Sequence, residues 1–483
     1  MVNPIWIIAI TLFSIFLMPI LGLISKKITK YFAFIPLIFN LYTSILIILK
    51  QQLMPSVITT GKFWPPIAIN LVIDYFTALF LLLINLMAIL ILLSHTSLRI
   101  ENPKFYTLFL LNILGANGIV LTGDLFNSFV FLEIMAISSY ALAASKKDRN
   151  ALEGSIKYMI TGSIASSLYL LGIFLLYKLT GSLNMAHIAG KIHGMEKGLT
   201  ILAGIFIIAG LAVDAELFPM NGWAPDVYQG AYSTIGAQLS SITSKAIFYL
   251  IFRIFFTVFN MLVFFKVLLY LGIITFVISE VVALSQRDLK RMLGYSSLGQ
   301  MGFSIFLFGL FGVTGHPEAL FAAILVAINH AFSKALMFNS IVQHGDNTSF
   351  DNLKGLGTAN VLTGKTFALG ALSLIGFPLL LGFWAKIEAI SAILRTGKIW
   401  LLFLVAAIFI IEAYYYLRFL SLYFAKDERR ICPIPALALV SFVIIVIIIS
   451  QGFYPVFSFN LVNKALISLF NRGLYLSIPT GGF

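Results

Sequence analysis

The stretch at residues 217–226, LFPMNGWAPD, places two prolines inside a long apolar part of the chain. A proline within a helix removes one backbone hydrogen bond and leaves a carbonyl oxygen without its helical partner. Two acidic residues, Asp214 and Glu216, precede the first proline, Pro219, and Trp223 comes just before the second, Pro225. The stretch therefore predicts a helix that is interrupted beside acidic groups.

The rest of the chain has the composition of an integral membrane protein. It has 483 residues, of which 60% are hydrophobic and 11% are charged, against about 25% charged residues in soluble domains. Apolar runs long enough for the roughly 20 residues of a membrane-spanning helix recur throughout. We expect an all-α fold of about fourteen transmembrane helices, with no soluble domain left over. The expected spans are 4–22, 31–50, 67–94, 105–122, 125–144, 155–178, 199–219, 234–258, 264–284, 295–313, 319–342, 361–393, 399–424 and 435–455.

Both ends of the chain carry an expectation. The first apolar stretch has no basic residues before it and no small-residue cleavage site after it, so we expect it to be a retained helix. Residues 456–483 are interrupted by Lys464 and Arg472, and we expect an amphipathic tail that can lie in the membrane interface.

The net charge of +13 is informative through its distribution over the loops. If Lys26, Lys27 and Lys30 are cytoplasmic, alternate loops place most other basic residues on the same side. This set is Arg99, Lys104, Lys146, Lys147, Arg149, Lys157, Arg287, Lys290, Arg291, Lys354, Lys365, Lys426, Arg429 and Arg430. The opposite side holds fewer, among them Lys62, Lys191, Lys197, Lys266, Arg395 and Lys398. The positive-inside rule then puts both termini outside, in the plasma membrane of a prokaryote.

The sequence gives no sign of a cofactor or of a nucleic-acid partner. Cys432 is the only cysteine and the six histidines are scattered, so we expect neither an iron–sulfur cluster nor a metal site built from these residue types. No phosphate-binding loop or dinucleotide fingerprint occurs, which argues against an ATP-driven pump. Redox or hydrolytic chemistry, where it is needed, must belong to other proteins.

Two stretches about 160 residues apart resemble each other: FPMNGWAP at 218–225 and FPLLLGFWAK at 377–386. Pro378 interrupts the second apolar run as Pro219 interrupts the first. The basic segments at 143–166 and 283–304, which lead into Gly- and Ser-rich runs, form a weaker second pair. Paired helix breaks predict a transporter-like fold with an ion site at the breaks, and chance similarity between biased sequences is the alternative. We divide the chain into 1–104, a first repeat at 105–260, a second repeat at 261–425 and an end segment at 426–483.

Ionisable side chains within the expected spans are candidates for function, because a charge at mid-bilayer costs about 2.5–3.5 kcal/mol on insertion scales. The candidates are Glu133, Asp214, Glu216, Lys245, Arg253, His330, Lys334, Lys386, Glu388, Glu412 and Arg418. Residues two apart lie on opposite sides of a helix, so Asp214 and Glu216 should not face one cavity, nor should Lys386 and Glu388. His330 and Lys334 are four apart and share a face, an arrangement that can pass a proton.

A buried lysine with a carboxylate neighbour is a switch, because breaking the pair weakens the lysine's hold on its proton. A pair between Glu133 and a lysine of a neighbouring helix would begin a line of such groups through the mid-plane. The alternative is that these charges only join helices. For Glu412, Arg418 and Arg253, which lie nearer to the expected helix ends, we favour this structural role.

Five segments resemble a known family: GDLFNSFVFLEIMAISSYAL (123–142), WAPDVYQGAY followed by SKA (223–246), QRDLKRMLGYSSLGQMG (286–302), INHAFSKALMF (328–338) and LSLIGFPLLLGFWAKIEAI (372–390). They are similar to the antiporter-like proton-channel subunits of respiratory complex I. The same family includes large subunits of multisubunit sodium/proton antiporters and of membrane-bound hydrogenases. The resemblance implies fourteen helices with two inverted five-helix repeats, each containing one broken helix.

The resemblance also implies roles for particular residues. Glu133 would be the carboxylate of the fifth helix, Lys245 the relay lysine of the eighth, and Lys386 the lysine at the second break. His330 and Lys334 would connect the two halves on the eleventh helix. The family usually has a lysine five residues before the proline of the first break and a histidine two residues after it. Here these positions are Asp214 and Asn221.

This departure leaves two hypotheses for the first half. Glu133 and Asp214 would be two carboxylates that repel each other unless they share a proton or bind a cation, and oxygen ligands suit hard cations such as Na⁺. The other hypothesis is that this half is altered or inactive, and that only the half from Lys245 to Lys386 conducts.

The leading interpretation is an ion-translocating subunit, for H⁺, Na⁺ or both, within a larger membrane complex. Its partners would be other membrane subunits, including neighbouring antiporter-like subunits, together with the lipid bilayer. A stand-alone solute transporter would need more polar groups at the breaks, and a scaffold with an inactive channel would not need the buried lysines. The parent complex stays open between a hydrogenase, a sulfur- or formate-linked complex, a quinone-reducing complex and a pure antiporter.

Overall fold

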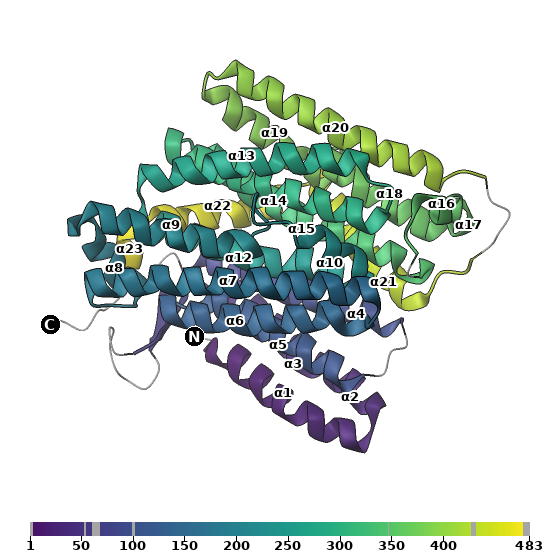
Figure 1. The fold of residues 1–483 in the computed structure, drawn as a ribbon, viewed down its shortest axis with the longest axis horizontal. Coiled ribbons are helices and arrows are strands. Elements are labelled where there is room, and N and C mark those ends of the chain that lie inside the picture. The colour runs from purple at the N-terminus through teal and green to yellow at the C-terminus, as the bar shows by residue number, and fades with distance from the viewer. Residues whose placement is uncertain are drawn as a thin grey trace.

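The computed structural model describes residues 3–52, 55–59, 68–98, 102–345, 347–426 and 431–476. Arg99, Lys62, Arg429 and Arg430 of the predicted charge pattern lie outside these ranges, as does 477–483 of the predicted tail. Most described residues belong to long helices packed side by side (Figure 1). The start of the first helix and the last described helix, α23, lie at the same end of the bundle (Figure 1).

The helices alternate with short connections. The first group is α1 (Ile5–Ile24), α2 (Lys26–Phe32), α3 (Phe34–Lys50), α4 (Tyr75–Thr96), α5 (Pro103–Leu121), α6 (Leu125–Ala143), α7 (Arg149–Thr180) and α8 (Met185–Lys191). The middle group is α9 (Lys197–Asp214), α10 (Ala224–Gly230), α11 (Ser233–Gln238), the π-helical η4 (Leu239–Thr243), α12 (Ser244–Phe252), the π-helical η5 (Arg253–Phe259), α13 (Leu262–Ser285), α14 (Leu289–Thr314) and α15 (Pro317–Ile341).

The last group follows α15. It is α16 (Phe350–Leu353), α17 (Leu356–Ala359), α18 (Val361–Ile375), α19 (Leu381–Arg395), α20 (Ile399–Tyr423), α21 (Pro435–Phe453), α22 (Val456–Phe470) and α23 (Arg472–Leu476). Short 3₁₀ turns are η2 (Ala144–Lys146), η3 (Ile192–Gly194) and η6 (Val342–His344). α22 packs against α4 and α15, so the first part of the predicted tail contacts the bundle, and an interfacial position for the tail stays a prediction.

The prediction of about fourteen membrane-spanning helices is confirmed. Thirteen helices in the described ranges have the length and apolar composition to cross a membrane. The predicted span at 361–393 is divided between α18 and α19, which are 15 residues each and so too short to cross alone. The inverted relation of the two five-helix repeats stays a prediction.

Helix ends follow local side-chain chemistry. Within the described ranges, seven helices begin at an Asp or Asn whose side chain accepts a hydrogen bond from a backbone N–H of the first turn, and this bond stabilises the start of the helix. These caps are Asp74, Asn102, Asp124, Asp148, Asn184, Asp288 and Asn360. The cap at Asp148 explains why α7 begins at Arg149, before the predicted residue 155.

A small hairpin corrects one predicted boundary. β1 (Ser56–Thr59) pairs with β2 (Asn70–Ile73) in antiparallel register, with Ser56 opposite Ile73. The predicted span 67–94 therefore begins only after the hairpin, where Asp74 caps α4. β-Branched and apolar residues at 70–73 fit a short buried strand as well as a helix, and pairing with β1 decides between them.

The first predicted break is present. α9 ends at Asp214 and α10 begins at Ala224, with Pro219 in the turns between them and Pro225 at the start of α10. The Phe218–Pro219 peptide bond is cis, and Glu216 has a positive φ of 60°. Because Glu216 is outside the helical region, the connection leaves the helix path before α10 begins.

The second predicted break is also present. α18 ends at Ile375, Pro378 lies in the connection, and α19 begins at Leu381. Gly376 has φ +88°, a conformation that side chains with a Cβ rarely adopt. A Cβ there would also lie 2.8 Å from Cδ of Lys386. The break thus brings backbone directly against the Lys386 side chain.

Two transmembrane segments are enclosed by the others. One runs from α11 through η5, the other is α15, and the apolar part of each is completely buried. By contrast, α1 to α3 and α19 to α20 form opposite edges of the bundle (Figure 1). Lys245 and Lys334, which lie on these two segments, are 0% exposed. The site is built around them.

Candidate functional site

A line of buried ionisable and tyrosine side chains runs through the bundle. We call it the buried polar chain and define it by these residues: Glu216, Tyr228, Lys245, His330, Lys334, Tyr416, Glu280, Tyr415, Glu412 and Lys386. Each is at most 9% exposed. They come from the first break and from α10, α12, α13, α15, α19 and α20, so segments far apart in the sequence together form the line.

One end of the buried polar chain is an ion pair at the second break. Lys386 Nζ lies 2.6 Å from Glu412 Oε2, and Gln300 Nε2 donates to the other carboxylate oxygen at 2.8 Å. The same ammonium is 3.8 Å from the centre of the Phe409 ring, a favourable place for a cation. We favoured a structural role for Glu412 because we did not foresee this partner. Glu412 lies within α20 and faces Lys386.

A second carboxylate lies near this pair. Tyr415 donates a hydrogen bond to Glu280 Oε2 at 2.7 Å. Glu280 Oε1 has no hydrogen-bond partner in the described ranges, and it occupies the space that a Cβ at Gly299 would fill. The charges of Glu280 and Glu412 interact with each other and with Lys334. Glu280 is therefore a member of the site that our sequence analysis missed.

Lys334 occupies the middle of the chain on α15. Its ammonium donates to the backbone oxygen of Leu293 at 2.8 Å and to the Tyr416 hydroxyl at 3.2 Å. Tyr416 in turn shares a hydrogen bond of 2.7 Å with Ser296. Lys334 makes no direct ion pair among the described residues, so only neutral groups hold its ammonium while carboxylates lie further away.

Lys245 and His330 are in direct contact. Lys245 Nζ lies 2.7 Å from His330 Nδ1 and 3.1 Å from the Ser244 hydroxyl. His330 Nε2 has no hydrogen-bond partner in the described part of the chain. Lys334 lies one turn from His330 on the same helix, as the spacing predicts. The contact between Lys245 and His330 joins α12 to α15.

The first break supplies two carboxylates with separate partners. Tyr158 donates to Asp214 Oδ1 at 3.0 Å, and Tyr228 donates to Glu216 Oε1 at 2.8 Å. The charge of Glu216 interacts with Lys245, whereas that of Asp214 interacts with Glu133. The two acids therefore have separate partners, as we expected, but α9 ends at Asp214, so the connecting backbone rather than helical geometry separates them. Glu216 is the acid of the break that faces the lysines.

Glu133 is placed differently from the other predicted site residues. It lies on α6, is only partly buried, and makes no hydrogen bond or ion pair with the residues that the structure describes. The predicted pair between Glu133 and a lysine is therefore not formed. The charge of Glu133 acts on Asp214, in the half of the site that holds the first break.

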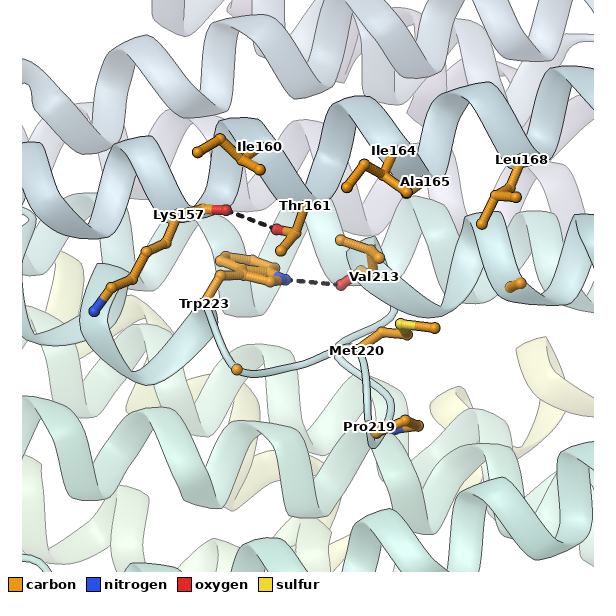
Figure 2. Close-up of a pocket in the computed structure, with 12 residues that line it drawn as sticks. Lys157, Ile160, Thr161, Ile164, Ala165, Leu168, Val213, Pro219, Met220 and Trp223 are labelled. Carbon is orange, nitrogen blue, oxygen red and sulfur yellow. Dashed lines mark hydrogen bonds between the residues drawn. The ribbon is translucent and has the colours of Figure 1, made fainter.

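A cavity of about 400 Å³ lies beside the first break. Figure 2 shows it between α7, with Ile160 and Ile164, and the connecting segment with Pro219 and Met220. Its inner wall is Trp223, whose indole N–H donates to the Val213 carbonyl at 3.3 Å (Figure 2). The same indole stacks on Tyr158, with ring centroids 3.5 Å apart. These contacts of Trp223 with Val213 and Tyr158 hold the first break against α9 and α7.

Another buried ion pair of this protein lies outside the buried polar chain. Arg253 Nη2 is 2.8 Å from Asp74 Oδ2, and the guanidinium also contacts the Tyr249 and Thr77 hydroxyls. The cluster joins η5 to α12, to Thr77 of α4 and to Asp74 at the start of α4, which fits the structural role that we favoured for Arg253. In the described ranges, no three His, Cys, Asp or Glu residues lie close enough together to hold a metal ion.

Comparisons with known proteins agree on one family. Residues 122–411 match the transmembrane family of NADH:quinone oxidoreductase and Mrp antiporter proteins. NADH-quinone oxidoreductase subunit N of Desulforudis audaxviator is 33% identical over 390 residues, which cover 76% of this chain and 77% of that one.

Two solved structures cover almost the whole chain. A chain of the archaeal membrane-bound sulfane sulfur reductase has a TM-score of 0.92 and 36% identity, with 98% of this chain and 99% of that chain covered. A chain of the Mrp complex of Dietzia sp. has a TM-score of 0.90 with 22% identity and 99% coverage of both chains, which shows the shared fold.

Proposed function

Because the chain belongs to the NADH:quinone oxidoreductase/Mrp antiporter family, we propose that it translocates ions as one membrane subunit of a multisubunit complex. The ion is H⁺, with Na⁺ as a second candidate at the first break. The driving force is redox chemistry in other subunits or an opposing ion gradient. The buried polar chain is the route.

The observation that carries the proposal is the burial of three lysines in one connected line. Lys245 and Lys334 are 0% exposed and Lys386 is 9% exposed. A lysine at mid-bilayer costs about 2.5–3.5 kcal/mol on insertion scales, and apolar residues of similar volume would stabilise a scaffold at least as well. Three such lysines with hydrogen-bonding neighbours therefore favour transport over a purely structural role.

The contacts support stepwise movement of protons. In the Lys245–His330 contact, Nδ1 of a neutral imidazole can accept a proton from the ammonium, while the other ring nitrogen is available to release one. Lys334 can receive charge next, because it lies one helical turn further along α15. Tyr416, Glu280 and Tyr415 bridge from Lys334 toward Glu412 and Lys386. Separation of Lys386 from Glu412 would weaken the hold of that lysine on its proton and drive the last step.

The ion used by the first half is tested with Asp214→Asn in the intact complex, reconstituted in vesicles and compared with wild type during turnover. If Asp214 and Glu133 share a proton or bind Na⁺, the change should reduce Na⁺- or proton-linked transport by about tenfold, since one charge of the site is lost. The measurement is the internal pH and the internal Na⁺ concentration. Asp351→Asn, which changes an exposed acid on α16, is the control and should transport normally.

Each outcome of this experiment has a distinct meaning. A loss of Na⁺ movement alone would assign a cation to the first break, and a loss of proton movement alone would assign a shared proton. Unchanged transport would contradict the proposal of an active first half. The ions would then pass only through the part from Glu216 to Lys386. Turnover of the wild-type complex without movement of either ion would place the whole chain in the scaffold class.

We further propose that the route continues into neighbouring membrane subunits, including other antiporter-like subunits. Glu133 supports this, because a partly exposed carboxylate within a membrane-spanning helix needs a partner outside the chain. The identity of 36% over nearly the whole sulfane sulfur reductase chain supports a respiratory parent complex of that kind. Full coupled transport by the purified chain alone would contradict the continuation.

We propose the plasma membrane of a prokaryote as the location, with both termini outside and the bilayer around the bundle. The exposed lysines Lys26 and Lys27 and the partly exposed Lys30 would then face the cytoplasm, in agreement with the positive-inside rule.

A further inference from the structure

The second break makes a buried polar contact with α15 that the buried polar chain does not include. Asn329, which is 4% exposed, immediately precedes His330 on α15. Its side-chain oxygen accepts a hydrogen bond from the Ser373 hydroxyl at 2.6 Å, and its amide nitrogen donates to the Ser373 carbonyl at 3.3 Å. Ser373 lies in the last turn of α18, directly before the break. The amide of Asn329 therefore binds both the side chain and the backbone of one residue at the edge of the break.

The first turn of α19 packs against the same contact. Gly382 is the second residue of α19, and a Cβ there would overlap the Ser373 carbonyl oxygen and lie 2.8 Å from the Asn329 amide nitrogen. Only glycine fits where α18, α19 and α15 meet this closely. Lys386 follows Gly382 by four residues and therefore lies on the same face of α19. The Asn329–Ser373 contact thus lies one helical turn from Lys386.

Asn329 and His330 point to different neighbours of α15. Consecutive residues on a helix are about 100° apart. The histidine contacts Lys245 of α12, whereas the asparagine contacts α18 and α19. Lys334 lies on the same helix, one turn after His330. The helix that carries the middle of the buried polar chain therefore also holds the break that precedes its last lysine.

The other side of the second break rests on α21. The Trp384 indole donates to the Gly452 carbonyl at 2.7 Å, and a Cβ at Gly452 would overlap the Leu379 carbonyl. Leu379 has a positive φ of 70°, which residues with a Cβ rarely adopt. These contacts hold the connecting loop and the outer side of α19. The contact with Asn329 ties the inner side of the break to the helix that carries His330 and Lys334.

A buried asparagine can also simply join two membrane helices, and Asn339 is such a residue on the same helix. Its amide nitrogen donates to the Leu437 carbonyl at 2.9 Å and to the Ser441 hydroxyl at 2.8 Å, both on α21. Asn329 and Asn339 thus share their helix, their burial and their partner groups, a serine hydroxyl and a backbone carbonyl. They differ in that Asn329 contacts a helix break one turn from Lys386.

We propose that Asn329 is a positioning residue for ion translocation, which holds the second break against α15 and so sets the place of Lys386 relative to Glu412. This inference deepens the proposed function and rests on it. Asn329 does not carry the moving charge, and its effect passes through Lys386. The charged groups that act on this part of the site are Glu412 of α20, Glu280 of α13 and Lys334 of α15. A shift of α19 changes the distances from Lys386 to the two carboxylates, on which the binding of its proton depends.

The test is the pH dependence of ion movement by Asn329→Ala in the intact complex, reconstituted in vesicles. Lys386 Nζ and Glu412 Oε2 are only 2.6 Å apart, so a displacement of α19 lengthens this distance and weakens the hold of the lysine on its proton. On the alkaline side, ion movement should fall to half its maximum at a pH at least about 0.5 unit lower than in wild type. Asn339→Ala is the matched control. It should lower the unfolding temperature to a similar extent and keep the pH dependence of wild type.

Two further variants change the contact from its other sides. Ser373→Ala removes the hydroxyl and leaves the carbonyl that Asn329 also binds, so we expect a smaller shift in the same direction. Added to Asn329→Ala, it should cause no further shift, because both changes remove the same contact. Gly382→Ala forces α19 away from α18 and should shift the pH dependence at least as far as Asn329→Ala does.

The positioning role is overturned if Asn329→Ala and Asn339→Ala show the same pH dependence, or if the shifts of Asn329→Ala and Ser373→Ala simply add. If Asn329→Ala does not assemble, the comparison of Ser373→Ala with Asn339→Ala decides between the same outcomes. Lys386→Met in the same vesicles separates this inference from the proposed function. Normal ion movement by Lys386→Met would contradict the proposed translocation, whereas its loss beside an unshifted Asn329→Ala would contradict the positioning role alone.

Discussion

Replacing Lys386 with methionine is expected to abolish ion movement by the assembled complex and to destabilise this chain. The change leaves Glu412 buried, with Gln300 as its remaining close polar partner. Removal of one member of a buried ion pair typically costs about 3–5 kcal/mol, so thermal unfolding should occur at a clearly lower temperature. Transport should fall at least about tenfold, because the last lysine of the route is missing.

A double variant separates these two effects. Lys386→Met together with Glu412→Gln removes both charges, so most of the lost stability should return, because no uncompensated charge remains. Transport should stay lost. Lys365→Met, which changes an exposed lysine on α18, controls for charge alone. If the double variant moved ions as well as wild type does, the ion pair would be structural and the proposed last step would be wrong.

Replacing Arg253 with methionine should destabilise this chain without reducing ion movement by the assembled complex. Asp74 would lose its ionic partner in a site where both side chains are 3% exposed, with an expected cost of about 3–5 kcal/mol. The guanidinium also lies 5.1 to 5.6 Å from the ring centres of Tyr475, Tyr249 and Phe76, and these cation–π contacts would be lost as well. We expect a lower unfolding temperature with normal transport per assembled complex.

The rescue variant is Arg253→Met with Asp74→Asn. Asparagine keeps the helix cap on α4, where the aspartate oxygen accepts from the Thr77 backbone N–H at 2.8 Å, and it removes the unpaired charge. Stability should recover in part. Arg287→Met, at an exposed position, should change little. A loss of transport in folded Arg253→Met complexes would add Arg253 to the route, contrary to its structural assignment.

The breaks and the spans could be predicted from the sequence because their signals are local. Pro219 and Pro378 each lie within a long apolar run and belong to a motif that occurs twice, and a proline there removes a helical hydrogen bond. The apolar runs indicate the number of crossings. The strand β2 escaped prediction because its three apolar residues, at 71–73, suit a helix or a strand equally well. Only pairing with β1, a tertiary contact, distinguishes them.

The partners of the site residues were harder to predict, because the local sequence does not determine which helices lie close together. Lys245, His330, Lys334 and Lys386 are all placed in the buried polar chain, where we expected a relay. The partner of Lys386 is Glu412, which we had assigned to helix joining. Glu280 was overlooked, although it is an acid inside a predicted span and the same rule of rare intramembrane charge would have found it.

The two acids of the first break have separate partners, as we expected, although for a different reason. We separated Asp214 from Glu216 by the angle that two residues subtend on a helix, but α9 ends at Asp214 and Glu216 has a positive φ. The backbone turn, rather than the helix, sets the directions of the two acids. Asp214 lies beside Tyr158 and Glu216 beside Tyr228.

Ion movement by the intact complex with Lys245→Ala is the most direct test of the relay. Lys245 joins α12 to α15 through His330 and lies between the first break and Lys334, so every proposed path from the first half passes it. The complex is reconstituted in vesicles, and internal pH and Na⁺ are followed during turnover beside wild type. We predict that the variant assembles and that ion movement falls at least about tenfold. Wild-type ion movement in an assembled Lys245→Ala complex would contradict the relay and would leave this chain as a scaffold.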